Sequence, residues 1–162
     1  MSLIDTYQQV YEFNRGRTLS LLDRVEQMPD AQQVLGWRPG LGRAHVGWQL
    51  MHIGVTEEIF AAERLATKDG RFRELWDCFK GGSTPDDDVP TVEQIREVLA
   101  GGRDDLLATL KELDESKLDE VAWEARDGRR ITLRGTLQII NWHEAHHQGQ
   151  AHITLNLHAG LQ

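Results

Sequence analysis

Three histidines and a glutamate lie close together in the stretch NWHEAHHQGQ, from Asn141 to Gln150. His143 and His147 are four residues apart, so on a helix both imidazoles lie on one side, with Cβ atoms about 5–6 Å apart. This spacing suits two ligands of one ion, since zinc binds imidazole nitrogen at about 2.0–2.1 Å. The segment also matches the HExxH pattern of zinc proteases. The stretch therefore predicts a metal site. The position of a third ligand determines whether this is a protease site or another kind of metal site.

The protease interpretation lacks that third ligand on the expected side. Zinc proteases with HExxH take it downstream, as a glutamate or as the last histidine of HExxHxxGxxH. No acidic residue follows His147, and Gln150 and Ile153 occupy the positions of the required glycine and last histidine. The missing ligand is therefore expected upstream, on another helix.

His52 is the candidate third ligand. It lies between Trp48 and Val55 on the apolar seam of a predicted helix. A lone inward histidine is more often a hydrogen-bonded core residue, but three on two facing seams favour ligands. Three neutral imidazoles also leave a coordination position open to water, whose pKa on zinc can fall to about 7, or to a thiolate or carbonyl oxygen. We predict one divalent ion held by His52, His143 and His147.

Four amphipathic segments are predicted to position these residues, because apolar residues recur along them at three- and four-residue steps. Thr91, with Gln94 three residues later, forms a capping box before the third segment. Gly101 and Gly102 inside it each weaken the helix by about 1 kcal/mol, so a kink is allowed there. The predicted helices are residues 3–28, 43–67, 92–113 and 133–157.

Two long connections separate the last three helices. The first contains GGSTPDDDVP, a turn-rich run expected to be solvated, with Asp86 to Asp88 on the surface. The second holds an Asp-Gly turn flanked by alternating residues, which predicts a short hairpin between Ala122 and Leu133. The fold class is all-α: a four-helix bundle with long connections between helices that allow crossovers. Residues 1–162 are expected to form one domain.

Charge and cysteine content exclude several classes of partner. The net charge of −8 argues against nucleic-acid binding, which depends on Lys and Arg neutralising phosphates. No apolar run approaches the length of a membrane span, and the N-terminus shows no signal-peptide core. Cys78 is the only cysteine, so no internal disulfide can form and a cytoplasmic setting is expected.

The chain resembles the DinB-like superfamily, often called DinB/YfiT-like metalloenzymes. The resemblance is carried by the lone seam histidine in WQLMHIGVTEE and by the ending HEAHHQGQ, which is similar to the HxxxHxGQ signature. It extends over most of the chain and implies the same three ligands, His52, His143 and His147. It also implies a divalent ion, commonly nickel or zinc, a homodimer, and in some branches a transferase or isomerase activity that uses a low-molecular-weight thiol.

Two function hypotheses follow. The first is a metal-dependent enzyme with a thiol-dependent S-transferase-like or hydrolase-like activity on a small molecule. The second is a non-catalytic metal- or ligand-binding helical bundle. An open coordination position favours the first, but no phosphate loop or cofactor motif names a substrate.

The residues next to the ligands have open roles. Glu144 is the candidate catalytic base, but it lies about 100° round the helix from His143, so a supporting or solvent-exposed position is favoured. Gln150 either hydrogen-bonds a ligand imidazole from the second shell of the site or packs helix ends. His146 is expected at the surface or partly buried.

Polar residues on the other seams are also candidates. His45 lies two turns from His52, about 10.5 Å along an undistorted helix, which is too far to share an ion. It is therefore a substrate-pocket or core residue. Asn14 and Thr18 either line a wet cavity near the metal or bond a neighbouring backbone. Cys78 is expected to be an incidental thiol.

Overall fold

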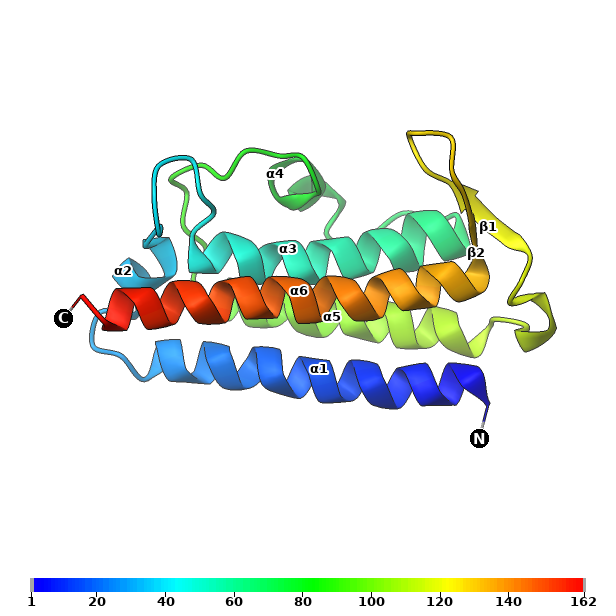
Figure 1. Ribbon diagram of the computed structural model, residues 1–162, viewed down its shortest axis with the longest axis horizontal. Helices are drawn as coiled ribbons and strands as arrows, with labels where there is room; N and C mark the ends of the chain where they lie inside the picture. Colours follow the sequence, from blue (N-terminus) through cyan, green and yellow to red (C-terminus); the bar gives the residue numbers. More distant parts are fainter. Residues whose placement is uncertain (1, 162) are drawn as a thin grey trace.

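The computed structural model describes residues 2–161 as a bundle of four long helices (Figure 1). The four are α1 (Leu3–Glu26), α3 (Val46–Ile59), α5 (Val92–Lys111) and α6 (Leu133–Ala159), and α3 continues into the π-helical segment η1 (Phe60–Ala66). The all-α four-helix prediction is confirmed. None of the helices in this part of the chain is long and apolar enough to span a bilayer.

The helices follow an up-down-down-up order. In Figure 1, α1 and α6 run in one direction, while α3 and α5 run in the other. α3 packs against both α5 and α6, and α6 packs against α1. Because α3 and α5 are parallel, the chain between them must return along the whole bundle. The crossover that the long connections allowed therefore lies between residues 67 and 91.

This crossover passes over α3, and its first part is packed against the bundle (Figure 1). Phe72, Trp76 and Phe79 are buried and belong to the apolar core. The turn-rich run that follows them does lie at the surface, with Asp86 to Asp88 exposed as predicted. Short helices in the connections are α2 (Ala31–Gly36), η2 (Arg73–Leu75), α4 (Trp76–Phe79) and η3 (Glu115–Lys117).

A short antiparallel hairpin connects α5 to α6, as predicted. Its strands are β1 (Val121–Glu124) and β2 (Arg130–Thr132). Gly128 in the turn has a φ of 82°, a left-handed conformation that glycine adopts without steric cost. The indole N–H of Trp123 donates to Thr136 Oγ1 at 3.0 Å, which fixes the hairpin on the first turns of α6.

Side-chain caps define where the helices begin. The capping box of Thr91 and Gln94 is present at the start of α5. α3 begins at Val46, three residues later than predicted, because His45 is its N-cap. The His45 Nδ1 accepts the backbone N–H of Trp48 at 3.0 Å. Histidine seldom serves in this position, so the seam pattern alone placed it inside the helix.

Two glycines bring α3 and α5 into backbone contact. A Cβ at Gly102 would lie 2.6 Å from the Gly54 carbonyl oxygen, and one at Gly54 would lie 2.9 Å from the Val98 carbonyl oxygen. α5 is a single helix from Val92 to Lys111. Gly102 thus allows close packing between the parallel helices, while Gly101 leaves room for the Phe72 ring of the crossover, and neither glycine interrupts α5.

The apolar core forms two clusters, with charged side chains at the level between them. One cluster contains Leu22, Leu50 and Leu99, and the other contains Leu106 and Leu137. At this level, each long helix contributes a buried ionic residue to one shared cluster. These four are Arg15, Glu57, Arg103 and Glu144.

Candidate metal centre

Three histidines from two helices meet at one point beside the crossover. His52 comes from α3, and His143 and His147 come from successive turns of α6. One ring nitrogen of each lies within 4.8 Å of the others. The Nε2 atoms of His52 and His143 are 3.0 Å apart. Two nitrogens bound to one tetrahedral zinc would lie about 3.3 Å apart, so the His52 and His143 nitrogens are already close to the separation that a shared ion requires.

The orientation of His52 is fixed from outside the bundle. Its Nδ1 lies 2.5 Å from the backbone carbonyl oxygen of Phe79 in α4. A carbonyl oxygen only accepts, so Nδ1 carries the proton and Nε2 turns its lone pair toward the other two rings. Trp48 stacks on the same ring, with centroids 4.7 Å apart and planes 16° from parallel. The ring is therefore held in its tautomer and its plane.

His147 is oriented in the same manner by Gln49. The His147 Nδ1 lies 2.8 Å from Gln49 Oε1, so Nδ1–H donates and Nε2 is left for the cluster. Sequence reasoning did not select Gln49. The signal was available, because Gln49 precedes His52 by three residues and therefore lies on the same face of α3.

Burial keeps the three rings neutral. It lowers the pKa of His143 to about 2, with the neighbouring His52, His147 and His146 adding to the effect. Burial likewise lowers the pKa of His147 to about 4, and it lowers that of His52. A neutral imidazole offers a lone pair to a cation. The cluster is a set of three nitrogen donors with no negative charge of its own.

Glu144 does not face this cluster. Its Oε1 accepts from Arg15 Nε and from Thr18 Oγ1, both at 2.8 Å, and its Oε2 accepts from Arg103 Nη2 at 2.6 Å. Glu57 completes the set, with oxygens 2.6 Å from Arg15 Nη2 and 2.7 Å from Arg103 Nη2. Two carboxylates and two guanidiniums thus form a buried, electrically balanced ionic cluster.

The contacts of Glu144 in this ionic cluster favour a structural role for its carboxylate. Burial opposes the charge on Arg15, yet Glu57 and Glu144 outweigh it and raise the pKa of the guanidinium. Both oxygens of Glu144 already accept hydrogen bonds from the cluster. A general base needs a free lone pair near the reacting atom, so this setting favours support of the fold over proton transfer.

The remaining candidates on α6 lie beside the three histidines. Gln150 Nε2 is 2.9 Å from Nε2 of His146, an exposed ring outside the cluster. His146 stacks on Trp142, with centroids 4.7 Å apart. Trp142 is 59% exposed. Gln49, from the facing helix, bonds His147 Nδ1, and a hydrogen bond with the Gln150 side chain also raises the pKa of His147 against the effect of burial.

Three further seam residues have structural partners. His45 is fully buried as the cap of α3 and is therefore a core residue. Asn14 Nδ2 donates to Asn141 Oδ1 at 2.9 Å, across the contact between α1 and α6. Thr18 Oγ1 bonds the ionic cluster and the Asn14 carbonyl. Cys78 is an exposed thiol in α4.

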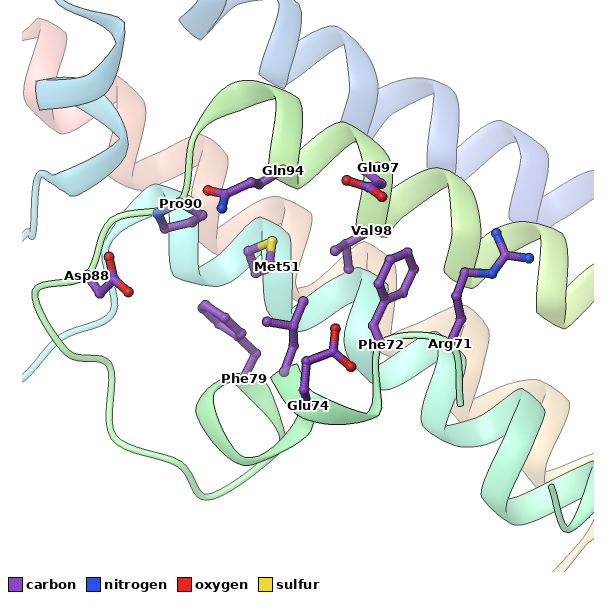
Figure 2. A pocket seen from close by; sticks show the side chains of 11 residues that line it. Met51, Arg71, Phe72, Glu74, Phe79, Asp88, Pro90, Gln94, Glu97 and Val98 are labelled. Carbon is purple, nitrogen blue, oxygen red and sulfur yellow. The ribbon is translucent and has the colours of Figure 1, made fainter. Parts of the chain in front are cut away.

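Two cavities flank the crossover. The first, called here the acidic pocket, has a volume of about 480 Å³. Figure 2 shows its apolar floor, which includes Met51 and Phe79, and the carboxylates of Glu74, Asp88 and Glu97 around it. The second, called the basic pocket, has a volume of about 350 Å³ and opens toward the hairpin. Its lining includes Thr56, Phe60, Glu63, Arg64, Arg73, Trp76, Lys80, Trp123 and Arg126.

Comparison with known proteins agrees with this fold. Residues 11–151 match the sequence profile of the DinB superfamily. A crystal structure of a conserved protein from Enterococcus faecalis is similar in fold, with a TM-score of 0.73, 18% identity and 99% of each chain covered. At that identity the likeness shows the fold alone. No curated protein matches the sequence.

Proposed function

The chain belongs to the DinB superfamily, and we propose that it is a divalent-metal-dependent enzyme acting on a small molecule, with His52, His143 and His147 as the ligands. One observation carries the proposal: three ring nitrogens from two helices converge within 4.8 Å. Hydrogen bonds from the opposite nitrogens of His52 and His147 support it, because they leave Nε2 free to bind an ion.

The donor set narrows the choice of ion. Imidazole suits zinc, nickel, copper and iron, while calcium and magnesium prefer oxygen ligands. We propose zinc or nickel, in line with the resemblance of the sequence to metal-binding relatives. When bound, such an ion supplies a Lewis-acid position for a thiolate or a carbonyl oxygen. A thiol-dependent S-transferase-like or hydrolase-like reaction fits that chemistry, with a low-molecular-weight thiol as co-substrate.

The protein itself supplies a rigid frame. Phe79 and Gln49 fix two of the rings before any ligand arrives, and Trp48 packs against His52. Such pre-organisation lowers the cost of bringing the three nitrogens together. Thr56 lies one turn beyond His52, and its Oγ1 is 3.3 Å from His52 Nδ1. This side of His52 adjoins the basic pocket.

The second candidate is a non-catalytic metal- or ligand-binding bundle. The setting of Glu144 favours it, since the acidic residue that follows a ligand is engaged in the ionic cluster.

Activity distinguishes the two candidates. Metal-loaded protein is assayed for thiol transfer to electrophiles and for ester and amide hydrolysis, with His52→Ala as the blank and His158→Ala as the matched control. The enzyme proposal requires an activity that the control keeps and the blank loses. Equal activity in the blank rejects it.

We also propose a homodimer in the cytoplasm, with neither nucleic acid nor membrane as a partner. Exposed apolar side chains on one face of α6 support the dimer. Trp142, Ile153 and Leu157 are 59%, 56% and 49% exposed and recur at helical spacing. Light scattering should give twice the 18.5 kDa chain mass, and Trp142→Arg should return the monomer. A wild-type monomer at all concentrations tested would reject the dimer.

A further inference from the structure

The basic pocket begins one helical turn from the histidine cluster. Thr56 lines it and lies 3.3 Å from His52 Nδ1. Lys80 also lines it and directly follows Phe79, whose carbonyl holds His52. The residues that line this side of the pocket therefore adjoin the groups that hold His52 in place. Its volume of about 350 Å³ is within the range of small-molecule sites, about 300–1,000 Å³.

The charge of this pocket is opposite to that of the whole chain. Four basic side chains and one acidic side chain line it, in a protein of net charge −8. Arg64 is paired with Glu63 at 2.9 Å, and Lys80 is paired with Asp77 outside the lining at 2.5 Å. The other two basic residues, Arg73 and Arg126, form no ion pair with any residue from 2 to 161. Two guanidiniums are thus available to an anion.

Aromatic rings hold two of the guanidiniums in place. The Arg73 guanidinium lies over the Trp76 ring at 4.4 Å, and the Arg64 guanidinium lies over the Trp123 ring at 4.9 Å. Stacking of this kind orients the donors of an arginine and reduces the entropy lost when it binds a carboxylate or a phosphate.

The two indoles are themselves fixed. The Trp76 N–H donates to Glu58 Oε2 at 2.6 Å, and the Trp123 N–H donates to Thr136 Oγ1 at 3.0 Å. The indoles come from the crossover and from the hairpin, on two sides of the pocket. They give it apolar walls whose positions depend on hydrogen bonds to the helices behind them.

We propose that the basic pocket binds a small organic anion that has a planar apolar part. The anionic group binds Arg73 and Arg126, while the apolar part lies between Trp76 and Trp123. The assignment as an anion site rests on the pocket alone.

The acidic pocket on the other side of the crossover supports the assignment of the anion to the basic pocket. Glu74, Asp88 and Glu97 line it (Figure 2). Its one basic residue, Arg71, is paired with Asp105 at 2.9 Å. The crossover thus turns Arg73 into one pocket and Glu74 into the other. An anion is attracted to the first pocket and repelled by the second.

The experiment is a calorimetric titration of metal-free full-length protein at low salt. The probe is naphthalene-2-sulfonate, and the neutral 2-naphthylmethanol is its matched comparison. The sulfonate should bind at least about tenfold more tightly than the alcohol, and its affinity should fall as salt is added. Arg73→Gln and Arg126→Gln should each weaken sulfonate binding by about three- to tenfold. Arg17→Gln, an equal change of charge on the exposed face of α1, should have no effect.

Two outcomes overturn the proposal. One is equal binding of the sulfonate and the alcohol. The other is sulfonate binding that the Arg73 and Arg126 variants leave unchanged. The His52→Ala variant separates this proposal from the metal function, because it should lose metal and keep the sulfonate site. Sulfonate binding that needs the metal and ignores both arginines would place the anion on the ion and reject the pocket.

Discussion

The backbone carbonyl of Phe79 accepts the Nδ1–H of His52 at 2.5 Å, across 27 residues of chain. This bond joins the crossover to the histidine cluster. It selects the His52 tautomer that leaves Nε2 free, and it does so with a main-chain atom. The geometry of the candidate metal site therefore depends on a segment that supplies no ligand.

The first prediction concerns metal content. Replacing His52, His143 or His147 by alanine should lower bound zinc or nickel sharply, because two imidazoles hold a divalent ion far less tightly than three. His146→Ala and His158→Ala are the matched controls and should keep the wild-type content. Elemental analysis of protein purified without an affinity tag measures the bound metal. If the wild type loses its metal during purification, all variants are first reconstituted with zinc or nickel. Full metal in His52→Ala together with loss in His146→Ala would mean that the site lies within α6 alone.

A second prediction tests the support of His147. Gln49→Leu removes the acceptor of the His147 Nδ1–H and should weaken metal binding by about 10–100-fold, with the helical content unchanged. Gln150→Leu serves as the comparison and should cost less affinity, because the 2.9 Å contact of Gln150 is with His146 outside the cluster. Competition against a chelator of known affinity gives the two constants. If Gln150→Leu costs more affinity than Gln49→Leu, the assignment of the supporting residue is reversed.

The ionic cluster leads to a third prediction, about stability. Glu144→Gln leaves Arg15 and Arg103 with one buried carboxylate, Glu57, between them. Breaking a buried ion pair from one side costs about 3–5 kcal/mol. Urea unfolding of the metal-free protein should show this loss. Glu12→Gln on the exposed face of α1 should stay within about 0.5 kcal/mol of the wild type. A Glu144→Gln protein as stable as the wild type but inactive would restore the catalytic role.

The fourth prediction is a pH dependence that comes from His45. Burial lowers the pKa of this ring, and the nearby Arg38 lowers it further. In the folded state, the His45 ring therefore stays neutral as the pH falls below about 6.5. In the unfolded chain, the same ring takes up a proton near that pH. The unfolded state binds more protons, so the His45 contribution to stability is present above about pH 6.5 and is lost on acidification.

His45→Asn tests this dependence, because asparagine keeps an N-cap acceptor and removes the titrating ring. The free energy of unfolding of chelator-treated protein should fall less between pH 7 and pH 5 in the variant than in the wild type. The buried histidines of the cluster contribute equally to both proteins and cancel in the comparison. Identical losses in the two proteins would show that His45 does not titrate on unfolding.

A fifth prediction compares two helical glycines. Gly102→Ala should destabilise the protein by more than about 1 kcal/mol, because the new Cβ would lie 2.6 Å from the Gly54 carbonyl oxygen. Gly16→Ala, where nothing lies within 4 Å of the Cβ, should stabilise it by about 0.5–1 kcal/mol through helix propensity. Thermal unfolding ranks the two variants. A stabilised Gly102→Ala protein would contradict the close packing of α3 on α5.

Local patterns predicted much of this structure. The periodicity of apolar residues identified the four long helices, and the Thr91 box marked where α5 begins. The Asp-Gly turn identified the hairpin. The three histidines were predicted as a group because two of them share a helical face and the third lies on a facing seam. In each case, residues near one another in sequence, or one face of a helix, carry the signal.

Contacts between distant segments were not predictable in the same way. Glu144 could be placed about 100° from His143, but its partners Arg15 and Arg103 come from two other helices. The carbonyl of Phe79 leaves no mark in a sequence, since every residue has one. The burial of the crossover aromatics was not predicted, because the turn-rich run that follows them dominates the composition of this connection. Such features depend on which helices become neighbours, and periodicity alone does not determine that.

The bond between His52 and Phe79 also bears on how a chain of this kind can diverge. The support given to the metal ligand comes from a backbone oxygen, while the side chain of the same residue points into the acidic pocket. Residue 79 can therefore change type, and with it the shape of that pocket, without loss of the acceptor.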